Sequence, residues 1–83
     1  MFYSLSRSQD LIQELDLYIA DWTGTEYAVL FSSLQHLIRI SRNKDYSEAR
    51  QYVMEYKDDF HYAAGGSWLY NEVMFLDTNT RWW

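Results

Sequence analysis

Apolar residues recur along the chain with the spacing of an amphipathic helix in three successive segments. In the first segment, Leu11, Leu15, Tyr18 and Trp22 fall on one face, and acidic side chains occupy the other positions. Gly24 follows directly and can adopt the left-handed conformation in which helices commonly end. This pattern predicts a helix that ends just before Gly24.

The second segment, residues 25–41, carries the longest apolar stripe of the chain. Thr23 stands in capping-box spacing with Glu26, and Thr25 is a rival N-cap. The stripe consists of Tyr27, Leu30, Phe31, Leu34, Leu37, Ile38 and Ser41. We expect this segment to form the most deeply buried helix.

A third helix is predicted from about residue 45 to residue 64. Asp45 and Glu48 have capping-box spacing at its start, and Gly65 and Gly66 are expected to end it. Its apolar stripe is formed by Ala49, Val53, Tyr56, Phe60 and Ala63. The continuous spacing of this stripe predicts one uninterrupted helix.

Residues 67–83 fit two structures. Leu69, Val73 and Leu76 have the spacing of a short helix capped by Ser67, whereas alternation from Leu69 to Phe75 is typical of a strand. The helix is favoured, and a strand that pairs with residues 1–5 is the alternative. The sequence therefore predicts an all-α fold, a compact bundle of three helices plus a short C-terminal fourth element. An α+β fold with a small sheet formed by the termini is the second choice.

The length of 83 residues favours a single small domain, residues 1–83, since a chain this short buries only about 60–65% of the surface that its unfolded form exposes. Aromatic residues make up 19% of the sequence, more than a small core hides completely. Some ring surface is therefore expected to face a partner or a second copy. The residues expected in the core are Leu15, Ile19, Leu30, Leu34, Leu37, Val53, Tyr56 and Phe60.

The charge balance is acidic, because twelve Asp and Glu outnumber seven Lys and Arg and give a net charge of −5. Direct nucleic-acid binding is disfavoured, since it depends on Lys and Arg contacts to phosphates. A basic protein surface is the partner that an acidic domain suits. There is no cysteine, no apolar run of membrane-spanning length and no signal-peptide pattern at the start, so the sequence predicts a soluble, cytoplasmic protein of a bacterial or other host cell.

The stretch EYKDDFHYAAGGSWLY, residues 55–70, is the densest group of candidate functional residues. Glu55, Asp58 and Asp59 share one helix face, and His61 follows Asp58 by three residues. A metal site is disfavoured because too few further ligands have suitable spacing, and no cofactor is expected. The remaining interpretations are a solvated acidic face, with Lys57 interleaved, and a recognition surface flanked by tyrosines.

Enzymatic activity is not expected. Ser32, Ser33 and His36 lie within one helical turn, but neighbours on one helix seldom reach the geometry of a nucleophile and its base. The basic residues around Arg39 suit the negative end of the second helix better than a DNA contact, because the following helix is acidic. The terminal Trp82 and Trp83 either seal the core or insert into a partner.

These observations favour a non-enzymatic inhibitor that binds the basic, nucleic-acid-binding surface of another protein. Phage antirestriction and anti-CRISPR proteins and nuclease immunity proteins are analogous in kind, although no motif is shared. A structural or adaptor subunit that self-associates through exposed aromatics, as a homodimer, is the alternative. The expected partner-binding residues are Asp45, Glu48, Tyr52, Glu55, Asp58, Asp59, Tyr62, Trp82 and Trp83.

Overall fold

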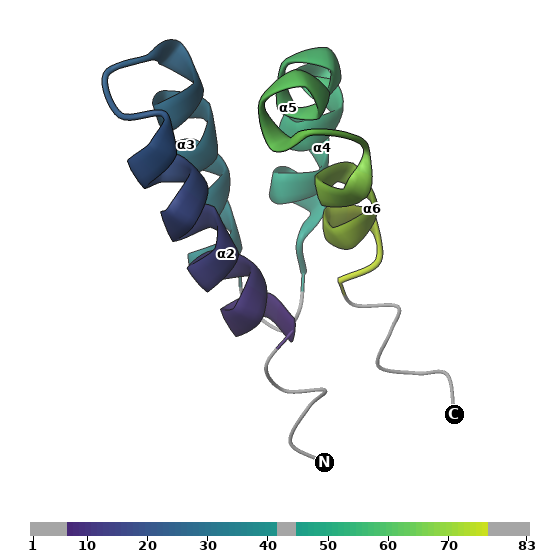
Figure 1. The fold of residues 1–83 in the computed structure, drawn as a ribbon. Coiled ribbons are helices and arrows are strands. Elements are labelled where there is room, and N and C mark those ends of the chain that lie inside the picture. The colour runs from purple at the N-terminus through teal and green to yellow at the C-terminus, as the bar shows by residue number, and fades with distance from the viewer. Residues whose placement is uncertain (1–6, 42–44, 77–83) are drawn as a thin grey trace.

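The computed structural model describes residues 7–41 and 45–76, and the only regular elements within these ranges are helices (Figure 1). The prediction of an all-α fold is therefore confirmed. The number of helices differs from the expected three plus one, because the described part contains five. These are α2 (Arg7–Asp21), α3 (Glu26–Arg39), α4 (Ser47–Glu55), α5 (Lys57–Ala64) and α6 (Trp68–Met74).

A tight turn joins α2 to α3 and makes them a helical hairpin. Gly24 has a φ of 88°, a left-handed conformation that favours glycine, so the expected stop at this residue is confirmed. Thr25 is the N-cap of α3, and its hydroxyl accepts a hydrogen bond from the backbone N–H of Tyr27. The prediction of Thr23 as the cap is wrong and the rival Thr25 takes that place, because the Thr23 hydroxyl donates backwards to the carbonyl of Ala20.

The predicted third helix is broken at Tyr56 into α4 and α5, which corrects the expectation of one continuous helix. Tyr56 has φ −110° and ψ 33°, outside the α-helical region, although its N–H still bonds to the carbonyl of Tyr52. Asp58 and Asp59 lie in the first turn of α5, where carboxylates stabilise the start of a helix. The acidic pair thus belongs to a new helix N-terminus. The continuous apolar spacing did not predict this helix start.

The glycine pair ends α5 as expected. Gly65 has a φ of 81°, and the N–H of Gly66 bonds to the carbonyl of His61 across 2.9 Å, the hydrogen bond of a Schellman motif. The chain then enters α6, so the strand alternative for residues 68–74 is wrong. Pairing of a strand with residues 1–5 lies outside the described residues. Ser67 precedes α6, but its side chain makes no capping bond.

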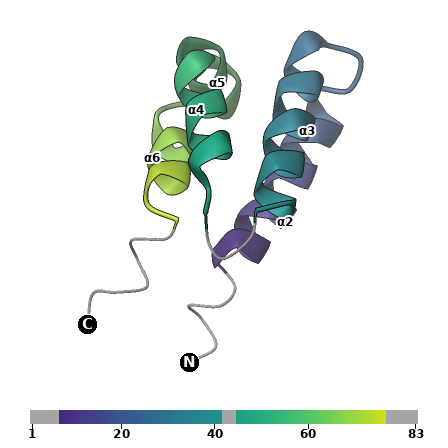
Figure 2. The ribbon, with the colours of Figure 1, turned by 180° about the vertical axis from the view of Figure 1, so that it is seen from behind.

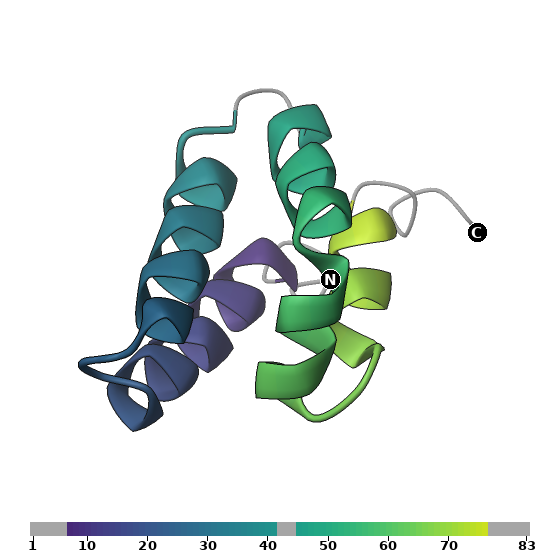
Figure 3. The same cartoon turned by 90° about the horizontal axis from the view of Figure 1, so that it is seen from above.

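The helices form two groups that pack face to face. The α2–α3 hairpin is one group, and α4, α5 and α6 are the other (Figures 2 and 3). In both views α6 lies beside α4, and it also packs against α5. A ring contact of 5.7 Å between centroids joins Tyr18 of α2 to Trp68 of α6. The two groups therefore share one interior.

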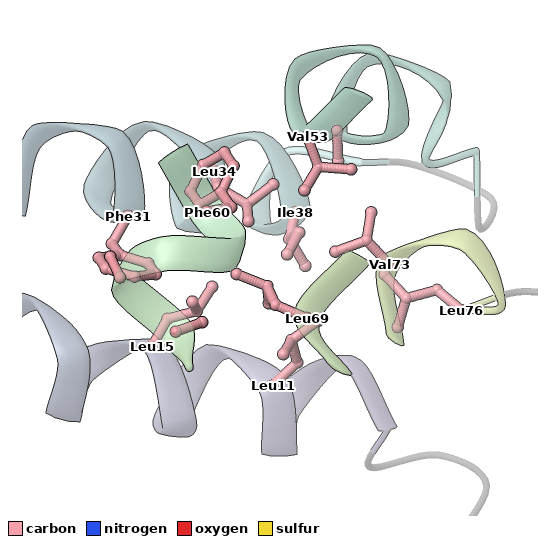
Figure 4. Packing of buried hydrophobic residues seen from close by; sticks show 13 residues of the cluster. Leu11, Leu15, Phe31, Leu34, Ile38, Val53, Phe60, Leu69, Val73 and Leu76 are labelled. Carbon is pink, nitrogen blue, oxygen red and sulfur yellow. The ribbon is translucent and has the colours of Figure 1, made fainter. Parts of the chain in front are cut away.

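Side chains from all five helices converge on this interior (Figure 4). Four of the expected core residues are fully buried: Leu15, Leu34, Val53 and Phe60. The other four are only partly buried and pack at the edge of the core: Ile19, Leu30, Leu37 and Tyr56. The core extends further than expected into α6, which buries Leu69 and Val73 completely.

One polar side chain lies inside the hairpin. Gln35 of α3 is buried, and its amide nitrogen donates to the carbonyl of Ile12 at 2.9 Å and to the carboxylate of Asp16 at 2.7 Å. A buried amide is tolerated when its hydrogen bonds are made, and these two bonds link α3 to α2. In the described ranges, no helix combines the length and the apolar character that crossing a membrane requires.

Candidate protein-binding surface

Carboxylates line the side of α4 and α5 that faces away from the core. Glu48, Glu55, Asp58 and Asp59 are all exposed, and we call these four residues the acidic face. Glu55, Asp58 and Asp59 line one open groove across the break between α4 and α5, whereas Glu48 lines another groove with Asp45 at the start of α4. The structure therefore brings Glu55, Asp58 and Asp59 together, with Glu48 about two turns away along α4.

Two basic residues, Arg50 and Lys57, lie between these carboxylates in the chain, and Lys57 lines an open groove together with Glu55, Asp58 and Asp59. The ammonium nitrogen of Lys57 lies 5.6 Å from the centroid of the Tyr70 ring on α6, a cation–π contact. This contact places the positive charge on the side where α5 packs against α6. The stem of Lys57 thus lies among the carboxylates, which still outnumber its charge on this surface.

Asp45 lines a groove with Glu48 at the start of α4 and acts as a local cap. Its carboxylate accepts hydrogen bonds from the hydroxyl and the backbone N–H of Ser47, at 2.7 and 3.2 Å. These hydrogen bonds, with a smaller effect of Arg50, lower the pKa of Asp45 below its ordinary value. Asp45 precedes α4, whereas Asp59 lies in the first turn of α5, beyond the break at Tyr56. Asp45 therefore lies at the far end of this surface.

The two tyrosines expected at the site have different environments. The ring of Tyr52 is half-buried and packs 4.9 Å from Tyr56 and 6.0 Å from Phe60, measured between centroids. Its apolar surface is largely used inside the molecule. Tyr62, in contrast, is 69% exposed at the C-terminal half of α5.

Tyr62 belongs to a group of three rings that the sequence spacing did not predict. Its centroid lies 5.5 Å from Tyr27 and 6.2 Å from Trp22, and these two are 5.0 Å apart. We call these three residues the aromatic cluster. Trp22 and Tyr27 flank the α2–α3 turn, so the cluster joins the hairpin to α5 at one end of the molecule. Only a prediction of how the hairpin packs on α5 would have found it.

Carboxylates adjoin the aromatic cluster. Burial is the main cause that raises the pKa of the Tyr27 phenol, and the negative charges of Glu26 and Asp59 raise it further. Asp59 also precedes Tyr62 by three residues on α5, a spacing that makes neighbours on a helix surface. The acidic face and the aromatic cluster therefore form one continuous surface.

A second acidic surface was not foreseen. Asp10 and Glu14 of α2 and Glu72 of α6 line an open groove together with Leu11 and the indole of Trp68. These carboxylates come from helices far apart in the sequence, so spacing alone could not join them. The groove provides a natural comparison for the acidic face.

The other candidate residues lie in unremarkable surroundings. Ser32, Ser33 and His36 line a shallow, mainly apolar groove that α3 shares with Tyr52. The ring of His61 contacts Tyr70 at 6.0 Å between centroids. Within residues 7–41 and 45–76, no group of three or more His, Cys, Asp and Glu is arranged to hold a metal ion. Trp82 and Trp83 lie outside the described residues.

No family model matches the chain, and no curated protein or solved structure is similar to it. Arguments about its function therefore depend on its own surfaces.

Proposed function

We propose that this protein is a non-enzymatic inhibitor that binds the basic, nucleic-acid-binding surface of another protein. One observation supports this most strongly: the exposed carboxylates of Glu55, Asp58 and Asp59 line one open groove, where they outnumber the single lysine that shares it. Lys and Arg side chains that normally contact phosphates would pair with the acidic face instead. Since such targets act on intracellular nucleic acid, the proposal places the protein in the cytoplasm of its host cell.

The spacing of the charges sets limits on how the inhibitor works. Glu48 and Glu55 lie about 10 Å apart along α4, given the rise of a helix. Duplex DNA carries one negative charge per roughly 1.7 Å of its axis, so the same length of DNA has about six phosphates. The two carboxylates on this part of α4 replace only part of that charge. The acidic face would therefore steer and orient the partner, and uncharged contacts nearby would supply much of the lasting affinity.

The main argument for the alternative, a subunit that self-associates through its aromatics, is weakened by the packing. In the described part of the chain, Tyr62 and Phe75 are the only exposed aromatic residues. The other rings there are half-buried or buried and contact the core. The exposed aliphatic residues Leu17 and Val29 lie on α2 and α3, whereas Tyr62 lies on α5 and Phe75 directly follows α6.

The proposal is tested by affinity capture from a nuclease-treated lysate of the source cell or its natural host. The first variant neutralises the acidic face with Glu55→Gln, Asp58→Asn and Asp59→Asn. The matched control removes the same charge from the α2–α6 groove with Asp10→Asn, Glu14→Gln and Glu72→Gln. Circular dichroism first establishes that both variants are folded.

Wild type and the groove variant should retrieve the same nucleic-acid-binding protein at low salt, and the face variant should not. Raising the salt concentration should weaken the capture, because exposed charges are screened. Equal retrieval by both variants, or recovery of the chain alone at every salt concentration, would contradict the proposal.

A further inference from the structure

Tyr62 differs from the other clustered rings because it is fixed and yet open to solvent. It is 69% exposed, while its ring contacts both Trp22 and Tyr27. These two partners are themselves half-buried and pack against the core. A ring held in this way loses little freedom when a ligand covers it, which favours binding.

The electrostatics of this surface select a cation. The face of an aromatic ring is negative because of its quadrupole, and a cation above it is attracted. Asp58 and Asp59 precede Tyr62 by four and three residues on α5, so both carboxylates lie one turn away from the ring. Glu26 adjoins Tyr27 on the hairpin side. A phosphate or another acidic group would be repelled from the same place.

Resting on the inhibitor function proposed above, we infer that the aromatic cluster takes one arginine side chain of the basic partner. The guanidinium lies flat on the exposed ring of Tyr62 and donates hydrogen bonds to the carboxylate of Asp59. Arginine suits this surface better than lysine, because its planar, weakly hydrated group stacks on rings and donates two parallel bonds to a carboxylate. The cluster thus supplies the uncharged contact that the sparse acidic face lacks.

The test uses the full chain labelled with ¹⁵N and two short synthetic peptides that alternate glycine with either arginine or lysine. Both peptides have the same charge. We expect the arginine peptide to shift the indole N–H signal of Trp22 and the amide signals of Tyr27 and Tyr62 in a saturable manner. The lysine peptide should bind about three-fold more weakly, the size expected of stacking at an exposed site.

Variants assign the effect to the cluster. Asp59→Asn and Tyr62→Ala should each weaken binding of the arginine peptide about three-fold or more. Tyr62→Phe should bind like wild type, since it keeps the ring. Asp10→Asn removes an equal charge from an exposed position on α2 and should leave the affinity unchanged. Asp59 is exposed, so its variant tests the inference even if Tyr62→Ala unfolds the chain.

The inference is overturned by equal binding of the two peptides, by equal weakening in Asp10→Asn, or by shifts confined to other residues. It is also overturned if the cluster signals move with the concentration of the protein alone, because a second copy then covers the rings. If the arginine peptide fails to bind the aromatic cluster but affinity capture of the partner still depends on the acidic face, the proposed function stands without this inference. Arginine binding without any captured partner would instead contradict the proposed function.

Discussion

At the scale of single residues, the polar side chains that matter most make contacts that depend on the fold. Gln35 was one polar position in an apolar helix, and nothing in its neighbours indicated that it would be buried. It is buried because α2 presents the carbonyl of Ile12 and the carboxylate of Asp16 to its amide. Sequence spacing describes one helix at a time, and these acceptors lie on another helix.

Replacing Gln35 with alanine should lower the free energy of unfolding by about 2 kcal/mol, because it removes two hydrogen bonds and leaves a small cavity. Gln35→Met keeps most of the volume without the hydrogen bonds and should cost less. Urea denaturation measures both values. A Gln35→Ala variant as stable as wild type would show that the two bonds contribute nothing.

The second prediction at this scale concerns Asp45. The hydrogen bonds from Ser47 are the main cause that lowers the pKa of Asp45 in the folded protein. The free energy that they add to the stability of the fold is present above the ordinary aspartate pKa of about 3.9. It is lost as the pH falls through the lower pKa of the folded state. Ser47→Ala should raise the pKa of Asp45 towards the ordinary value. Titration of the carboxyl ¹³C signal by NMR measures it.

Ser67→Ala is the matched control, because Ser67 also stands before a helix but makes no capping bond with its side chain. It should leave the pKa of Asp45 unchanged. An unchanged pKa in Ser47→Ala would mean that the hydroxyl of Ser47 does not stabilise the carboxylate, since the variant keeps the backbone N–H that also donates to it.

At the scale of elements, apolar periodicity predicted where helices lie better than where they begin and break. The stripes of α2 and α3 and the stop at Gly65 were predicted correctly from the sequence. The break at Tyr56 was not, since the apolar positions continue through it with helical spacing. The acidic residues at the start of α5 favour a new helix N-terminus, whereas the apolar spacing favours a continuous helix. Only the packed structure shows that the new helix start prevails.

The two threonines before α3 give a prediction for an element boundary. Thr25→Ala removes the N-cap and should lower the free energy of unfolding by about 1 kcal/mol. Thr23→Ala should cost clearly less, because the Thr23 hydroxyl bonds only to carbonyls at the exposed end of α2. Thermal or urea unfolding of the two variants compares them directly. The reverse order of stability would assign the cap to Thr23.

At the scale of the whole molecule, the candidate site was predicted in part. The acidic residues of α4 and α5 could be found from their spacing within one segment. The aromatic cluster could not, since Trp22 and Tyr27 join Tyr62 only when the hairpin packs on α5. The groove between α2 and α6 was missed for the same reason. Surfaces assembled from several helices need the tertiary structure.

As an inhibitor of this kind, the protein would use its acidic face to compete with nucleic acid for a basic protein surface. The most direct measurement is the fluorescence anisotropy of a labelled nucleic acid bound to the captured partner, as this protein is added. Wild type and the groove variant should displace the nucleic acid equally, and the variant with Glu55, Asp58 and Asp59 neutralised should not. Displacement that is absent for wild type, or equal for all three proteins, would contradict the account.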